Sequence, residues 1–258
     1  MKKSLLLCGL LLALTASIAS AAGVNLRWTN CFGDAGLTNR TSACASSIGN
    51  AGILVGSFVL GADQLGTSGV EIVLDVATAG ATLPAWWLAA GVGPCRAGLT
   101  MNSTISATAT NCFDWASGGA AGGLAAYNQG TAIIGGLNTA RGIGGFAVAA
   151  SGIADLPANT EFFAFNAVLS NVKTTGTGAC AGCQTAACIV LNSIKVATPP
   201  VVGQPSRDVV LSGPSNGTDS NYVTWQGGAG VSSLRGNGCP AATPTRNATW
   251  SSVKSLYR

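Results

Sequence analysis

The segment at residues 179–188, ACAGCQTAAC, places three cysteines close together, two of them as a C-x-x-C pair. Such residues could act as a redox dithiol, ligate zinc or form structural disulfides. Because the chain contains no histidine, only Cys239 could complete a four-cysteine zinc site. A thioredoxin-like motif should begin a helix, whereas strand-like sequences flank this segment on both sides. We therefore predict that this cysteine trio (Cys180, Cys183 and Cys188) is structural, with no bound metal or cofactor.

The first 21 residues have the character of a secretory signal peptide. Lys2 and Lys3 precede an apolar stretch, and Ala19-Ser20-Ala21 fits a cleavage site. The apolar stretch is shorter than the roughly 20 residues that span a bilayer. We predict that residues 22–258 are secreted to the extracellular space, with the periplasm and the cell surface as alternatives, and that no transmembrane segment remains after cleavage.

Eight cysteines lie beyond the predicted signal peptide, and disulfides are the expected state of cysteines in an exported protein. Two pairs are close in sequence, so we expect the bonds Cys31–Cys44 and Cys95–Cys112, each worth roughly 3 kcal/mol by loop entropy. For the rest, we expect one bond within the cysteine trio and one from the trio to Cys239. The eight are Cys31, Cys44, Cys95, Cys112, Cys180, Cys183, Cys188 and Cys239.

Stretches that alternate apolar and polar residues indicate half-buried strands. In 70–77 the branched apolar side chains would face the core, whereas Glu71 and Asp75 would face solvent. Residues 116–145 are rich in Gly and Ala, which we interpret as long loops. We predict an all-β, disulfide-stapled β-sandwich of the jelly-roll kind, with no long helix in the mature chain. The expected strands are 24–28, 53–60, 70–77, 99–108, 145–150, 161–169, 188–196 and 208–212.

The composition changes near residue 212. Residues 22–212 are expected to form the sandwich, and the Gly-, Pro- and Ser-rich residues 213–258 are interpreted as an irregular C-terminal extension, docked or tied by Cys239. Whether this extension is a sorting or a docking element stays open. A short echo, Asn30-Cys31-Phe32 and Asn111-Cys112-Phe113, is expected to mark two strand-to-loop transitions beside disulfides.

The residue inventory argues against catalysis. Without histidine, neither a Ser-His-Asp triad nor a Cys-His pair can form. Asp34 with Asp114, or Glu161 with Asp155, could approach one another in the fold, but nothing in their spacing pairs them. We therefore predict a protein without catalytic residues.

Charged residues make up only 9% of the chain, against about 25% in typical domains. Scattered basic residues argue against nucleic-acid binding, and weak repulsion between copies permits self-association. The leading hypothesis is a non-catalytic structural or adhesive protein whose partner is another copy or a surface glycan. The alternative is a carbohydrate-binding module in which an exposed Trp87 or Trp115 stacks on a sugar, and an enzyme of unrecognised type ranks third. In general character the chain resembles secreted bacterial β-sandwich proteins, a resemblance that implies no specific site.

Overall fold

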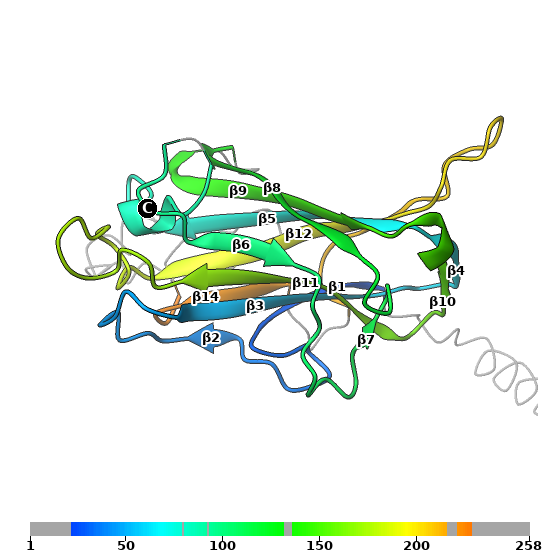
Figure 1. Cartoon of the computed structure of the whole chain (residues 1–258), viewed down its shortest axis with the longest axis horizontal. Coiled ribbons are helices and arrows are strands. Elements are labelled where there is room, and N and C mark those ends of the chain that lie inside the picture. The colour runs from blue at the N-terminus through cyan, green and yellow to red at the C-terminus, as the bar shows by residue number, and fades with distance from the viewer. Residues whose placement is uncertain (1–21, 79, 92, 132–135, 216–220, 229–258) are drawn as a thin grey trace, which may run out of the picture.

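The computed structural model describes residues 22–78, 80–91, 93–131, 136–215 and 221–228. Two β-sheets face each other as the layers of a sandwich (Figure 1). Sheet A has the order β1 (Gly23–Trp28), β3 (Asn50–Val59), β11 (Glu161–Ser170) and β6 (Leu99–Asn102), and β7 (Phe113–Asp114) pairs with β11. Sheet B has the order β2 (Asn39–Arg40), β14 (Tyr222–Trp225), β12 (Ala187–Ala197), β5 (Gly69–Thr78), β9 (Gly136–Ala147) and β8 (Ala121–Gly130), and β13 (Val209–Leu211) pairs with β12.

The remaining elements are short. A two-stranded sheet joins β4 (Gln64–Thr67) to β10 (Ala154–Leu156), and two 3₁₀ helices span Ala85–Trp87 (η1) and Ala150–Gly152 (η2). Among the described residues, no helix has the length and apolarity needed to cross a membrane. The prediction of a disulfide-stapled all-β sandwich without long helices is confirmed. The predicted signal peptide lies outside the described residues.

The core forms where alternate side chains of the two sheets meet. Val70 and Ile72 of β5 are almost fully buried, as are Ile189 and Leu191 of β12, whereas Glu71 is exposed. This is the period of two that a strand imposes on its side chains. The alternation in the sequence therefore located these strands correctly.

Asp75 departs from the expected pattern. It was predicted to face solvent, yet it is fully buried and accepts two hydrogen bonds of 2.8 Å from the guanidinium of Arg141 on β9. These hydrogen bonds raise the pKa of Arg141. A buried carboxylate requires such a partner because burial without one is strongly unfavourable.

The prediction of long loops over residues 116–145 is wrong, because most of this segment forms β8 and β9. These strands pair with each other, and β9 also pairs with β5 along nearly its whole length. Glycine is required at one point of close approach: a β carbon at Gly122, whose φ is +156°, would lie 2.0 Å from the backbone oxygen of Gly145 on β9. The small residues thus allow dense packing here, and the pairing of β8, β9 and β5 outweighs the low strand propensity of glycine and alanine.

The predicted C-terminal extension also contains ordered sheet. Residues 222–225, expected to be irregular coil, form β14, which pairs with β12 and β2. Trp225 on this strand is completely buried in the main core. Residues 229–258, including Cys239, lie outside the described residues.

Candidate functional site

The described disulfides join segments that are distant in sequence. Their sequence separations are 81, 139 and 85 residues, so the expected local bonds Cys31–Cys44 and Cys95–Cys112 are wrong. Pairing depends on the approach of Cα atoms, which are 6.0–6.2 Å apart in these bonds and are brought together by the sheets. The three bonds are Cys31–Cys112, Cys44–Cys183 and Cys95–Cys180.

The cysteine trio holds a loop against two other segments. Cys180 and Cys183 bond to partners elsewhere in the chain, so the expected bond within the trio is wrong. Cys188 is also disulfide-bonded. Cys239, which was expected to bond to one member of the trio, lies outside the described residues. The C-x-x-C sulfurs are therefore committed to two separate cross-links and do not form a dithiol.

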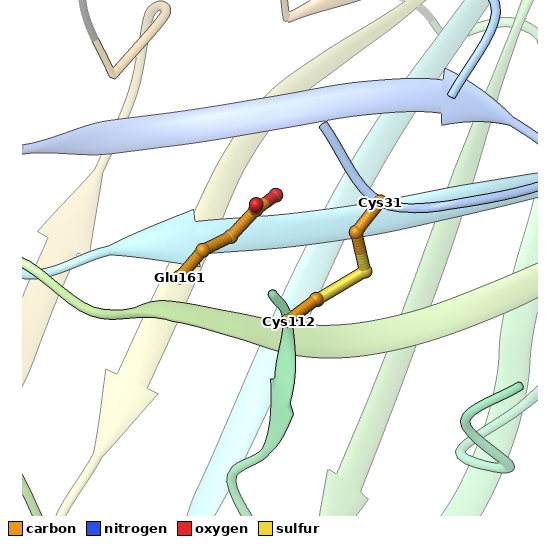
Figure 2. Close-up of side chains that lie close together, drawn as sticks. All are labelled: Cys31, Cys112 and Glu161. Carbon is orange, nitrogen blue, oxygen red and sulfur yellow. A yellow bond between two sulfur atoms is a disulfide. The ribbon is translucent and has the colours of Figure 1, made fainter. Parts of the chain in front are cut away.

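The echoed tripeptides meet in the fold. Cys31 and Cys112, one from each copy of the echo, bond to each other, and the carboxylate of Glu161 lies beside their disulfide (Figure 2). Glu161 accepts hydrogen bonds from the backbone N–H groups of Phe32 (3.1 Å) and Gly33 (2.7 Å), and also one from the Ser57 hydroxyl. Disulfide sulfurs are not thiolates, and the carboxylate is already bonded, so this cluster does not have the donors of a metal site.

A second carboxylate, Asp34, joins the loop that contains Cys31 to the loop that contains Cys112. Asp34 accepts hydrogen bonds from the N–H and hydroxyl of Thr110 and from the N–H of Asn111. Burial alone would raise the pKa of Asp34, but the hydrogen bonds from Thr110 and Asn111 outweigh it and lower the pKa below its ordinary value. We call the Cys31–Cys112 disulfide, Asp34 and Glu161 together the clasp: the disulfide and Asp34 join the two loops, and Glu161 ties the first loop to β11 and β3.

The other acidic residues have similar structural roles. Asp114 caps backbone N–H groups at Ala116 and Gly118, and neither it nor Asp155, which binds the Gly66 N–H, is hydrogen-bonded to another carboxylate. Among the described acidic residues, every carboxylate has a hydrogen-bond or ion-pair partner. These residues are Asp34, Asp63, Glu71, Asp75, Asp114, Asp155, Glu161 and Asp208.

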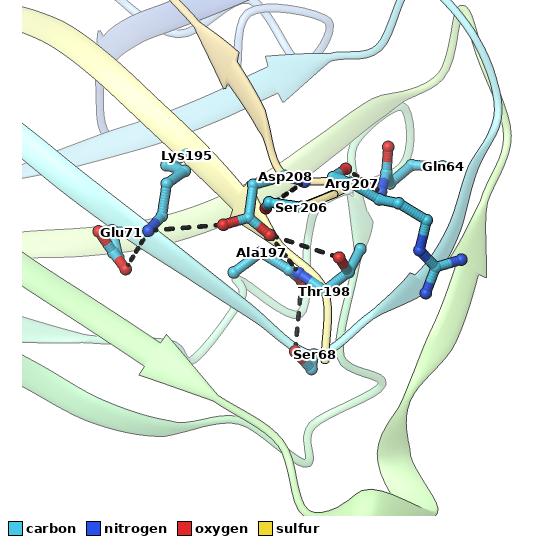
Figure 3. Close-up of polar contacts among 9 residues, drawn as sticks. All are labelled: Gln64, Ser68, Glu71, Lys195, Ala197, Thr198, Ser206, Arg207 and Asp208. Carbon is cyan, nitrogen blue, oxygen red and sulfur yellow. Dashed lines mark hydrogen bonds and ion pairs between the residues drawn. The ribbon is translucent and has the colours of Figure 1, made fainter. Parts of the chain in front are cut away.

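Lys195 lies between two carboxylates on the outer side of sheet B, 2.6 Å from Glu71 and 3.7 Å from Asp208 (Figure 3). The hydrogen bond with Glu71 raises the pKa of Lys195. A backbone hydrogen bond from Thr198 lowers the pKa of Asp208. A shallow groove of about 320 Å³ runs from Glu71 past Gly145 to β8, and it is lined mainly by small side chains. Lys195 therefore acts as the cationic partner of Glu71 and Asp208 and not as a catalytic base.

The two tryptophans proposed to bind sugars are not available for stacking. Trp87 is 1% exposed and Trp115 is 2% exposed, so the expectation of an exposed ring at these positions is wrong. Burial of a large aromatic side chain removes a large apolar surface from water. Trp87 and Trp115 both contribute to the main core in this way. Trp87 also supports β8, because its carbonyl accepts a hydrogen bond from the Tyr127 hydroxyl.

Trp87 belongs to a cluster of four buried tryptophans centred on Trp225. The ring centroids of Trp28, Trp86 and Trp87 lie 5.8, 5.4 and 6.0 Å from that of Trp225. The guanidinium of Arg96 stacks 3.6 Å above the Trp86 ring, and burial lowers the pKa of Arg96 to about 10. The cluster packs the interior and presents no ligand-binding surface.

One edge of the sandwich differs from the others. β1 is buried along its whole length, and its Val24 N–H donates to the Gly213 carbonyl. The edge strands β2 and β6 have only two and four residues. In contrast, β8 has ten residues, pairs with β9 at the end of sheet B, and is approached by β6, whose Met101 carbonyl lies close to Gly123.

Neither this edge nor the Asp34–Glu161 clasp was predicted from the sequence. A signal for the edge was present, because residues 115–140 contain no charged side chain. Comparisons with protein-family models, curated proteins and solved structures find no match to the chain.

Proposed function

We propose that the protein is secreted after removal of residues 1–21 and acts as a non-catalytic structural or adhesive β-sandwich, at the cell surface or in extracellular material. Association with other copies or with a surface matrix would be its activity. The disulfides support a location in an oxidising compartment.

The observation that carries the proposal is that every described carboxylate is already engaged in hydrogen bonds or an ion pair. Each described carboxylate is bound to a backbone N–H, a hydroxyl or a cation that it holds in place, as Glu161 and Asp34 do in the clasp. General acid–base catalysis needs a titratable group within reach of a substrate proton. A chain without histidine, whose described carboxylates are used in this way, is better suited to a structural role.

The surface supports the associative part of the proposal. With 9% charged residues, two copies repel each other weakly, and the groove beside β8 is lined by small side chains. Folded domains that must remain apart ordinarily carry more charge.

The test combines association and surface retention. Mature protein of residues 22–258 is examined by sedimentation velocity from micromolar to near-millimolar concentration, and the producing cells are fractionated to locate the protein. We expect a weight-average mass that rises with concentration, or retention on the cell surface. A strict monomer that is recovered only in the medium would overturn the proposal, as would turnover of a substrate that is lost in Glu161→Gln.

A further inference from the structure

One end of the outer face of sheet B is buried, although this face points away from sheet A. Ala77 of β5 and Cys188 of β12, which pair with each other, are fully buried, and Val190 is 1% exposed. We call these three residues the outer patch; they form a cluster separate from the main core, because successive side chains of a strand point to opposite faces. At the other end of the same face, Glu71 is exposed and Lys195 is partly exposed (Figure 3). A side chain on an uncovered sheet face keeps contact with water, so the outer patch is covered.

The described strands lie in the wrong places to provide this cover. Those that contact β5 and β12 most extensively are their neighbours within sheet B and β1 of the facing sheet. The small sheet of β4 and β10 lies at the opposite end of β5 (Figure 1). Asp75, on the same face as the outer patch, has an interaction in addition to its hydrogen bonds with Arg141. The cover therefore comes from a part of the chain other than these strands.

The disulfide of Cys188 identifies the covering segment. Cys188 is disulfide-bonded, and the other described cysteines pair with one another in the three bonds given above. The sequence has two further cysteines, Cys8 and Cys239. Cys8 belongs to the signal peptide that the proposed secretion removes. Cys239 is therefore the partner that remains in the mature chain.

The path of the chain brings Cys239 within reach of Cys188. Thr224 of β14 pairs with Cys188 across the sheet, and the last described residue is Gly228. Residues 229–238 can extend over about 33 Å, at roughly 3.3 Å per residue. A disulfide needs Cα atoms about 4.4–6.8 Å apart, so this length lets the chain turn back across the outer face before the bond closes.

We propose that residues 229–239 fold back over the outer patch and are fastened there by a Cys188–Cys239 disulfide. The two thiols lose two electrons and two protons, which a disulfide oxidant of the export compartment accepts as it is reduced to a dithiol. Val231 and Leu234 supply the segment with apolar side chains that such a patch would bury. The inference rests on the proposed secretion, which removes Cys8, and goes beyond it by making the start of the C-terminal extension a docked part of the sandwich.

Peptide mapping of the oxidised mature protein tests the bond. Without reduction, trypsin should leave the peptide 236–246, which contains Cys239, joined to 174–195, which contains Cys188. In Cys188→Ala the peptide 236–246 should be released. Release of 236–246 from the parent, its presence only in linked dimers, or its retention in Cys188→Ala would overturn this inference and leave the proposed function standing. An N-terminal peptide that retains Cys8 would overturn the proposed secretion instead, and the same map would show which cysteine Cys188 binds.

Trypsin cleavage of the folded protein tests the cover. Arg235 lies in the covering segment, whereas Arg207 lies in the exposed loop between β12 and β13 and is the internal control. Replacing Cys188 and Cys239 together by alanine should speed cleavage after Arg235 by about tenfold, because the segment then opens locally, and cleavage after Arg207 should stay within about twofold of the parent. Circular dichroism confirms that the double variant is folded, and the peptide map of the parent does not depend on it. A rise at both sites, or at neither, would overturn the cover.

Discussion

Trp225 should be one of the most important single side chains for stability. It is completely buried, contacts three other tryptophans and donates its indole N–H to the Cys183 carbonyl at 2.7 Å. A buried tryptophan removes 150–250 Å² from water, worth about 4–6 kcal/mol at roughly 25 cal/mol per Å². Measured aromatic-to-alanine substitutions in cores cost about 3–5 kcal/mol. We therefore expect Trp225→Ala to lower the free energy of unfolding by about 4 kcal/mol.

The assay is equilibrium urea unfolding of the oxidised protein at 25 °C, followed by far-ultraviolet circular dichroism. Trp225→Phe keeps part of the buried area but loses the indole donor, so its loss should be about half as large. Val210→Ala is the control, because Val210 is 64% exposed on β13, which pairs with β12 as β14 does. Its free energy of unfolding should stay within about 0.5 kcal/mol of the parent.

A free energy of unfolding for Trp225→Ala within about 1 kcal/mol of that of the parent protein would contradict this prediction. Such a result would mean that β14 is not part of the cooperative core. The chain beyond residue 212 would then be the separable extension that its composition indicates.

Three further variants test the cross-links and the clasp. Replacing Cys95 and Cys180 together by alanine should lower the free energy of unfolding, measured in urea, by about 4.6 kcal/mol on the loop-entropy model, because the bond closes a separation of 85 residues. A loss below about 2 kcal/mol would count against this pairing. Glu161→Gln should cost about 1–3 kcal/mol in the same assay, because charge-assisted hydrogen bonds to two backbone N–H groups are weakened, and a neutral effect would contradict the clasp. Because folding lowers the pKa of Asp34, its hydrogen bonds stabilise the fold in full at pH values above the ordinary pKa of 3.8, and this stabilisation is lost as the pH falls through the folded-state pKa. Urea midpoints measured from pH 6 to pH 2 should therefore fall less steeply for Asp34→Asn than for the parent protein. Parallel curves for the two proteins would refute this.

The sequence alone determined the fold class and several strands. The segments at 70–77, 161–169 and 188–196 were located because alternation in a strand depends only on neighbouring residues in the chain. The absence of histidine excluded histidine-dependent catalysis by residue type alone.

The tertiary structure decided what depends on residues distant in sequence. The disulfides pair cysteines that the sheets bring together, which spacing along the chain cannot reveal. Asp75 can be buried because β9 places Arg141 beside it. Residues 121–130 and 136–147 form strands because pairing in the sheet outweighs the low strand propensity of glycine and alanine. The position of β8 at the end of sheet B is likewise a property of the assembled sheet, since it depends on the order of strands that are distant in sequence.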